Sequence, residues 1–250
     1  MHEAPTRRAE IRFYEELNDF LPPEQRKRSF ETTFHGSRSV LDLIQALGVP
    51  HTEIDVILVD GESVGFDHRV EGGERIAVYP TFERFDVSSV TRLRPEPLRE
   101  PRFVCDVHLG HLARDLRTLG FDTSYERELT DDEIVARAVD EHRIVLTRDR
   151  GILDRRAVTH GHWIRTTDPE AQVVEVVRAL DLKDSIELFT RCRECNGELE
   201  AVARVTVHDE VPPKIFAEHD EFTRCSGCGR VYWRGSHYDR MRERLGELLD

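Results

Sequence analysis

Short runs of alternating apolar and polar residues fill the first third of the chain, and this period of two is typical of half-buried β-strands. Strands are predicted at residues 9–14, 29–34, 54–59 and 75–79. Residues 37–47 instead space their apolar side chains three and four positions apart, which predicts a helix that stops at Gly48. The order strand, strand, helix, strand, strand predicts an α+β domain of the β-grasp type over residues 1–90.

The pattern changes after residue 101, where short apolar runs alternate with longer amphipathic segments. The apolar runs predict buried strands at residues 103–105, 121–125, 144–147 and 162–165. Helices are predicted at residues 109–119, from Thr130 onward, and at 168–180. This alternation predicts an α/β domain in three layers, a parallel sheet with helices on both faces, over residues 102–184. Residues 91–101 are rich in proline and charge and are predicted to be a linker.

Two Cys-x-x-Cys pairs mark the third region, residues 185–250. They consist of Cys192 with Cys195 and Cys225 with Cys228. A two-residue spacer lets one tight turn direct two sulfurs at the same point, and zinc prefers four thiolates in a tetrahedron. A disulfide pair or a redox pair is the alternative, but two matched pairs favour a structural zinc ion. A strand over residues 198–207 and a helix over 236–249 are predicted around them.

Composition limits the classes of function. The 250-residue chain carries a formal net charge of −13, which argues against tight binding of long nucleic acid by a basic surface. A nuclease that meets phosphodiesters through carboxylate-bound metal ions remains compatible with that charge. No apolar run approaches the roughly 20 residues of a membrane span. We see no signal-peptide pattern, and metal-binding thiols suit a reducing compartment, so no membrane association and a cytoplasmic location are expected. Cys105 lies in an apolar run and is predicted to be buried.

Acidic residues follow two of the predicted parallel strands. Asp106 ends the first strand of the second domain, and Asp149 comes shortly after the third. Asp131 and Asp132 begin a helix, where the helix dipole alone would favour them. The active crevice of a parallel sheet lies beyond the carboxyl ends of its strands, so carboxylates are expected to gather there. Gathered carboxylates repel one another unless a cation intervenes, which favours magnesium or manganese.

Segments of this chain are similar to two known protein groups. Residues 106–123 resemble the opening of the PIN-like domain in the Mut-seven C-terminal ribonuclease family, and 143–150 resemble its second signature. Residues 191–197 and 225–229 resemble that family's zinc ribbon, while 58–61 and 73–80 resemble ubiquitin-like sulfur carriers of the MoaD and ThiS type. Sulfur-carrier chemistry is not expected, because Gly72 and Gly73 precede the last predicted strand of their domain.

The resemblance implies a metal-dependent ribonuclease with an RNA substrate and a PIN-like fold. It implies that Asp106, Asp131 and Asp149 hold the catalytic metal. Asp122 or Asp154 is a candidate for a fourth acidic position, and Asp132 is a further acidic neighbour. His108 or His111 is a candidate for proton transfer. The candidates for contacting the flanking phosphates are Arg114, Arg117 and Arg148. Arg117 could instead lie along the helix surface.

Several alternatives stay open from the sequence. Asp115 is expected to be solvated rather than a ligand, and Tyr232 and Trp233 either stack on an RNA base or pack the ribbon. The main rival to the enzyme is a non-catalytic adaptor that binds RNA, or a protein partner through the β-grasp domain. A sulfur-transfer accessory protein is a weaker third reading. The cut position, the acceptance of DNA and the oligomeric state are left open.

Overall fold

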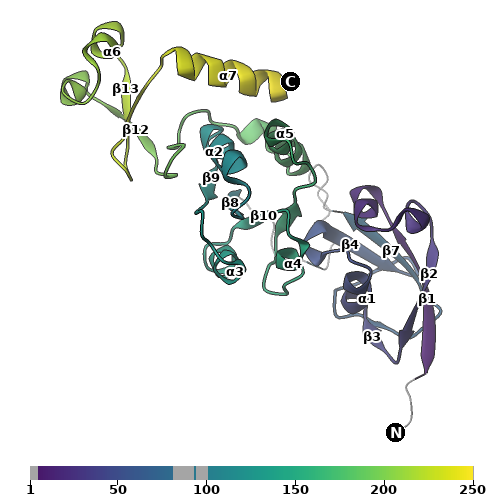
Figure 1. The fold of residues 1–250 in the computed structure, drawn as a ribbon. Coiled ribbons are helices and arrows are strands. Elements are labelled where there is room, and N and C mark those ends of the chain that lie inside the picture. Colours follow the sequence, from purple (N-terminus) through teal and green to yellow (C-terminus); the bar gives the residue numbers. More distant parts are fainter. Residues whose placement is uncertain (1–4, 81–92, 94–100, 250) are drawn as a thin grey trace. The chain divides into compact units, whose positions relative to one another are not determined.

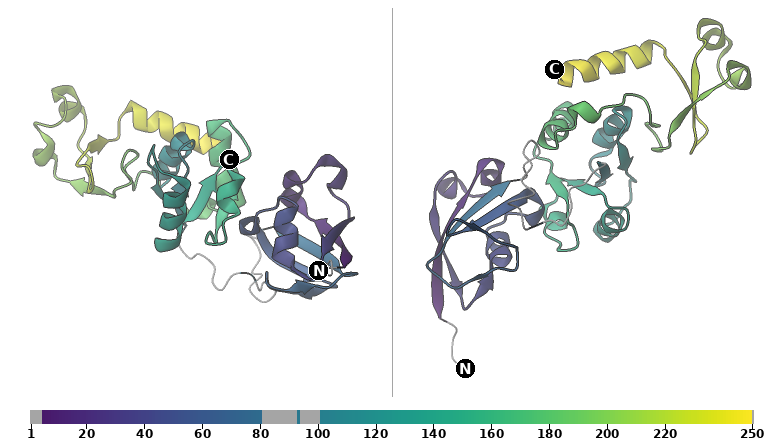
Figure 2. Two further views of the ribbon diagram at one scale, coloured as in Figure 1. Left: turned by 60° about the horizontal axis from the view of Figure 1, so that its bottom comes forward. Right: turned by 180° about the vertical axis from the view of Figure 1, so that it is seen from behind.

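The computed structural model describes residues 5–80, 93 and 101–249. Its residues group into two compact units, one drawn from residues 1–100 and 149–163 and the other from 101–148 and 164–250. Among the described residues, no helix has the length and apolar character needed to cross a membrane. The two units are described separately below (Figures 1 and 2).

The first unit contains a five-stranded mixed sheet with the order β2-β1-β7-β4-β5. Its strands are β1 Thr6–Phe13, β2 Phe30–His35, β4 Ile54–Val59, β5 Glu62–Ser63 and β7 Arg75–Pro80. The first and last of the long strands, β1 and β7, pair in parallel at the centre, while β2 and β4 pair antiparallel to them. This is the β-grasp arrangement that the sequence predicts.

The helix of this sheet is shorter than the sequence predicts. Helix α1 spans Val40–Ala46, and the two residues before it form strand β3, Arg38–Ser39, which pairs with β6, Arg69–Val70. The hydroxyl of Ser39 accepts a hydrogen bond from the Asp42 N–H at 3.1 Å. Such a side-chain cap satisfies one of the free N–H groups of the first turn and fixes where the helix begins. Short 3-10 turns lie at Glu15–Phe20, Pro23–Gln25 and His51–Glu53.

Residues 149–163 also belong to the first unit. They form helix α4, Arg150–Leu153, and strand β11, Gly161–Trp163. The Arg150 guanidinium lies 4.1 Å from the centre of the Trp163 ring and 4.8 Å from that of Phe20. The Trp163 N–H donates to Glu53 Oε1 at 2.5 Å, and His51 Nε2 lies 2.7 Å from the Val158 carbonyl oxygen. This segment therefore packs with residues of the β-grasp domain.

The second unit is built on the parallel sheet that the sequence predicts. Within this unit, β8, Arg102–Cys105, lies between β10, Ile144–Thr147, and β9, Asp122–Ser124, and pairs in parallel with both. Helices α2, Gly110–Thr118, and α5, Pro169–Ala179, lie on one side of it, and α3, Asp131–Asp140, lies on the other (Figure 1). The observed β9 and β11 are each shorter than the strands that the sequence predicts.

The C-terminal part of the second unit is a small antiparallel sheet, β12-β13-β14. Its strands are β12 Leu199–Val202, β13 Phe222–Cys225 and β14 Val231–Trp233, with α6 at Pro213–Glu218 and α7 at Ser236–Leu249. The single strand predicted over residues 198–207 is divided, because a 3-10 turn over Arg204–Val207 follows β12. A further 3-10 turn lies at Lys183–Ser185. We call residues 190–235 the ribbon.

A short segment joins the ribbon to the parallel-sheet domain and packs against the end of α2. Gly120 ends that helix with a φ of +101°, and the N–H groups of Glu187 and Phe189 donate to the carbonyls of Leu119 and Thr118. A side chain at Gly120 would collide with the Glu187 carbonyl. Glycine is therefore required here by backbone conformation and by close approach.

Candidate active site and metal centre

Asp106 occupies the carboxyl end of β8, as the sequence predicts. Its side chain is buried, with 3% of its surface exposed. One carboxylate oxygen accepts from the Thr147 hydroxyl at 2.5 Å and from the Arg148 N–H at 3.0 Å, and the other accepts from the His108 N–H at 2.7 Å. Because β8 and β10 are parallel neighbours, their carboxyl ends meet, which brings Thr147 and Arg148 to Asp106. The donors hold this carboxylate in one orientation.

The other candidate metal ligands occupy the beginnings of helices. Asp149 is the N-cap of α4 in the first unit and accepts from the Gly151 N–H at 2.8 Å. Asp131 and Asp132 are exposed in the first turn of α3, which a capping box between Thr130 and Glu133 begins. Each position suits a carboxylate for local reasons as well as for metal binding.

The histidines and two of the arginines proposed for the site are accessible. His108, His111 and Arg148 are exposed, and Arg114 is half-buried. A hydrogen bond from the Tyr125 hydroxyl to the Val107 carbonyl, at 3.2 Å, holds the loop that carries His108. Asp154 is exposed at the end of α4, where its carbonyl accepts from the Gln45 amide.

Arg117 has a position that neither sequence-based alternative describes. Only 4% of its surface is exposed. Its guanidinium donates to the Thr123 carbonyl at 2.8 Å, the Glu194 carbonyl at 2.8 Å and the Arg193 carbonyl at 3.3 Å. Burial lowers the pKa of Arg117, and neighbouring acidic groups oppose that shift. Arg117 therefore connects α2 to the first Cys-x-x-Cys turn, and it is unavailable to a phosphate.

Asp122, a candidate for the fourth acidic position, takes part in the same connection. It accepts from Arg143 at 2.7 Å and from the Asn196 side chain at 2.7 Å, and it lies 3.9 Å from Arg191. Burial alone would raise the pKa of Asp122, but the hydrogen bonds from Arg143 and Asn196 lower it. The Asn196 side chain also accepts from the Thr123 N–H at 2.9 Å. These contacts indicate that Asp122 has a structural role.

Asp115 is buried, whereas the sequence predicts a solvated side chain. It is 4% exposed and forms ion pairs with Arg244 of α7 at 3.0 Å and with Arg193 at 3.5 Å. Arg244 also pairs with Glu170 of α5 at 3.3 Å. The expectation fails because helical periodicity cannot reveal that α7, far along the chain, supplies a cation to this face of α2.

The four cysteines of the ribbon form a cluster. The ligand atoms of Cys192, Cys195, Cys225 and Cys228 all lie within 4.8 Å of one another. Among the described residues, acidic and histidine side chains form no group of three at that spacing. Four thiolates would fill all four positions of a tetrahedral zinc ion, so this ligand set suits zinc in a structural role.

Backbone geometry around the cluster suits thiolates. Burial opposes ionisation of Cys225, but the Cys228 and Gly227 N–H groups donate to its sulfur, and together with a contact to the Cys195 sulfur they bring its pKa down to about 7. A side chain at Gly197 would lie 2.8 Å from the Cys225 sulfur. The glycine is therefore needed where the two turns approach each other.

Comparison with family models identifies both parts of the chain. The model described as Mut7-C RNAse domain matches residues 101–245, which is more than half of the sequence. The chain belongs to the Mut7-C RNAse domain family. The model described as Mut7-C ubiquitin matches residues 6–86, the β-grasp domain. Searches among curated proteins and among solved structures found no match.

Membership of the Mut7-C family supports a ribonuclease-type function and an RNA substrate. The Mut7-C match spans the parallel-sheet domain, the ribbon and most of α7, which agrees with the contacts that join them. The sequence did not predict the structural roles of the residues that make those contacts. Arg117 donates to backbone carbonyls, which carry no sequence signal, whereas the Asn-Gly at 196–197 was a visible turn signal.

Proposed function

We propose that this Mut7-C protein is a metal-dependent ribonuclease that hydrolyses RNA phosphodiester bonds near the carboxyl ends of β8 and β10. The observation that carries the proposal is the Asp106 carboxylate, buried at the end of a parallel strand and oriented by three donors. Burying a carboxyl group costs free energy unless it is hydrogen-bonded, and the carboxyl ends of parallel strands are where open sheets bind their ligands.

The Asp106 carboxylate fits a hard divalent ion. An ionised carboxylate offers about four lone-pair sites, and three of them accept hydrogen bonds here, so one remains for a metal. Magnesium and manganese prefer oxygen ligands of this kind. We assign Asp131 and Asp149 as the further carboxylates that hold the ion, and both are exposed and so accessible to it.

The proposed roles of the protein groups follow from where they lie. A divalent ion held by these carboxylates would lower the pKa of a bound water and offset phosphate charge. The Thr147 hydroxyl and the two backbone N–H groups keep Asp106 fixed while charge changes nearby. His108 and His111 are exposed beside the loop and are assigned to proton transfer. Arg114 and Arg148 are assigned to phosphates on either side of the cut bond.

The deciding experiment compares conservative aspartate variants. Asp149→Asn keeps an N-cap side chain at α4, because asparagine caps helices as well as aspartate does. We expect this variant to cleave labelled single-stranded RNA at least about 100-fold more slowly with magnesium or manganese, a loss typical of removing one electrostatic contact with the transition state. Asp106→Asn should do the same, and Asp140→Asn, at the exposed far end of α3, is the matched control.

Folding is checked on the same samples by circular dichroism and bound zinc. Full cleavage by both folded variants would refute the assignment and favour the adaptor, with the observed cleavage due to a contaminant.

The cysteine cluster is proposed to hold one structural zinc ion per chain. Zinc would supply a four-coordinate centre between the two Cys-x-x-Cys turns, in a ribbon whose fully buried apolar cluster is small. Elemental analysis of the purified protein should give one zinc per chain, and Cys195→Ser should lose it. Retention of full zinc content by that variant would contradict the proposal.

We assign the β-grasp domain a supporting role in this function. The segment that begins with Asp149 packs with β-grasp residues through Arg150 on Phe20 and through Trp163 on Glu53. Arg156 adds an ion pair with Asp42 at 3.0 Å. A protein partner that binds the β-grasp domain would thereby act on the segment that carries Asp149.

A further inference from the structure

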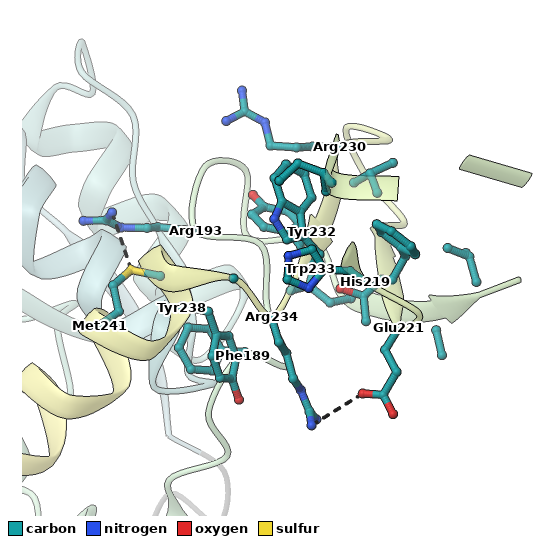
Figure 3. Close-up of a pocket in the computed structure, with 18 of the residues that line it drawn as sticks. Phe189, Arg193, His219, Glu221, Arg230, Tyr232, Trp233, Arg234, Tyr238 and Met241 are labelled. Atoms are coloured by element: carbon teal, nitrogen blue, oxygen red, sulfur yellow. Dashed lines mark hydrogen bonds and ion pairs between the residues drawn. The ribbon is translucent and has the colours of Figure 1, made fainter. Parts of the chain in front are cut away.

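A large pocket lies in the second unit, between the ribbon sheet, the segment around residues 188–194 and the start of α7 (Figure 3). Its volume is about 1150 Å³. None of the aspartates assigned to catalysis lines it. It is therefore a separate site from the one proposed for hydrolysis.

Aromatic side chains form the walls of this pocket. The rings of Phe189 and Tyr238 lie with their centres 4.0 Å apart and their planes inclined by 31°. Figure 3 shows Trp233 and Tyr232 of β14 gathered on the opposite wall with His219, which follows α6. All five side chains are half-buried, so each is supported by the fold and still presents part of its surface to the pocket.

The rim of the pocket is more basic than the rest of the protein. Five lysine or arginine and four acidic side chains line it, giving a local charge of +1 on a chain whose net charge is −13. Three of the four acids already have basic partners: Glu221 pairs with Arg234, Glu218 with Lys214 and Asp220 with Arg204. Arg230 extends at one edge of the pocket and Arg234 at another (Figure 3). Among the described residues, the Arg230 guanidinium has no hydrogen-bond or ion-pair partner, although the Arg230 carbonyl accepts from the Cys225 N–H.

We propose that this pocket binds unstacked bases of single-stranded RNA and so holds the strand outside the catalytic site. Aromatic faces with arginines beside them suit bases and their phosphates, because every base has a π-face and every linkage carries a negative charge. A peptide would not require that combination. The inference rests on RNA as the substrate of the proposed ribonuclease.

Binding can be measured apart from cleavage. The full-length, zinc-loaded Asp149→Asn protein is titrated into fluorescein-labelled oligouridine, and anisotropy gives the dissociation constant. Tyr238→Leu keeps an apolar side chain against Phe189 but removes one ring face. It should weaken binding about 5- to 150-fold, the range for loss of one base–aromatic stack. Arg230→Ala should weaken binding and reduce its dependence on log salt by about 0.7. The matched control is Arg240→Ala, an exposed arginine of α7 outside the pocket.

Tryptophan fluorescence reports the site directly, because the chain has two tryptophans, Trp163 and Trp233. In a Trp163→Phe protein, oligouridine should quench the emission of Trp233, whereas inorganic polyphosphate should not. Equal quenching by polyphosphate would indicate attraction of charge alone and would overturn the assignment to bases. Unchanged RNA affinity in both Tyr238→Leu and Arg230→Ala would also overturn it and would leave the pocket to a protein partner.

The outcome separates this inference from the proposed function. Pocket variants in the wild-type background should still hydrolyse a small phosphodiester such as bis(4-nitrophenyl) phosphate at the wild-type rate. If Asp149→Asn loses that activity while the pocket variants bind RNA as the wild type does, only the proposal that the pocket binds RNA is refuted. Weaker binding by the pocket variants with unimpaired hydrolysis in Asp149→Asn refutes only the catalytic assignment.

Discussion

The β-grasp domain and the ribbon reach a folded state by different means. Among the described residues of the first unit, seventeen buried apolar side chains form one cluster, including Ile11 and Ile57, which are fully enclosed. The ribbon has a buried cluster of three, Val207, Val211 and Phe222, with five partly buried hydrophobic side chains packed against it. A core of the first size suffices for a small domain, whereas one of the second size does not. Burial of apolar surface therefore stabilises the β-grasp domain, and the zinc ion that we propose would supply stability that the buried apolar residues of the ribbon do not.

The contrast extends to what each region contacts. Polar contacts join the ribbon to the parallel-sheet domain, among them those of Arg117, Asp122 and Asn196. Such contacts are directional, so they fix orientation while adding little area. The β-grasp core, in contrast, depends on volume and shape. Mutations in the two regions should consequently differ in how much stability they remove and in how that loss depends on pH and on chelators.

Removal of zinc should have the largest effect and would break the comparison most directly. Structural zinc contributes about 10–16 kcal/mol in small zinc domains, so chelation or Cys195→Ser should unfold the ribbon. Amide hydrogen exchange of residues 190–235 should rise to that of an unfolded chain, while exchange in β1, β4 and β7 should not change. Cys105→Ala is the control cysteine variant. Persistent protection of the ribbon amides after chelation would show that its small core is sufficient.

Truncation in the β-grasp core should give the second largest effect. Ile57 of β4 is fully buried. Ile57→Ala should lower the free energy of unfolding of the first unit by about 2–5 kcal/mol, and Ile57→Val, the matched control, by about 0.5–1.5 kcal/mol. Denaturant unfolding followed by hydrogen exchange measures both, and zinc content should stay at the wild-type level. A loss of zinc in Ile57→Ala would show that the two regions are coupled.

The polar connection at Asp122 should give a smaller, pH-dependent effect. Its folded-state pKa is lowered, so its stabilising contribution is fully present above the unfolded value, about 3.9, and is lost as the pH falls through the folded value. Asp122→Asn should cost about 1.5–3 kcal/mol at pH 7. The difference in unfolding free energy between variant and wild type should shrink below about pH 4. A difference that does not depend on pH would rule out the ionised carboxylate as its source.

Loss of the α1 cap should have the smallest effect. The Ser39 hydroxyl accepts from the Asp42 N–H, and Ser39→Ala should cost about 1 kcal/mol of first-unit stability. Ser39→Asp, which preserves a capping oxygen, should restore it. Thermal unfolding compares the three proteins, and an alanine variant as stable as wild type would mean that packing alone positions the helix.

Local signals account for what the sequence could predict. Period-two runs located β1, β4 and β7, and paired cysteine spacing located the cysteine cluster, because in each case neighbours along the chain produce the pattern. Asp106 could be placed at a strand end for the same reason. The burial of Asp115 and Arg117 could not be foreseen, since Arg244 and the Glu194 carbonyl come from distant segments. The division of the chain near Asp149 likewise depends on side-chain packing with Phe20 and Glu53.

Cys105 is the cysteine outside the ribbon, and its burial should make it unreactive. Its thiol is wholly enclosed at the end of β8, and burial together with the charge of Asp106 raises its pKa. A thiolate is the form that reacts with alkylating reagents, so this sulfur should stay silent in the folded protein. With the proposed zinc ion bound, maleimide should label the native chain only as zinc dissociates from the ribbon cysteines. Mass spectrometry of the labelled protein over time would therefore measure the rate of zinc release.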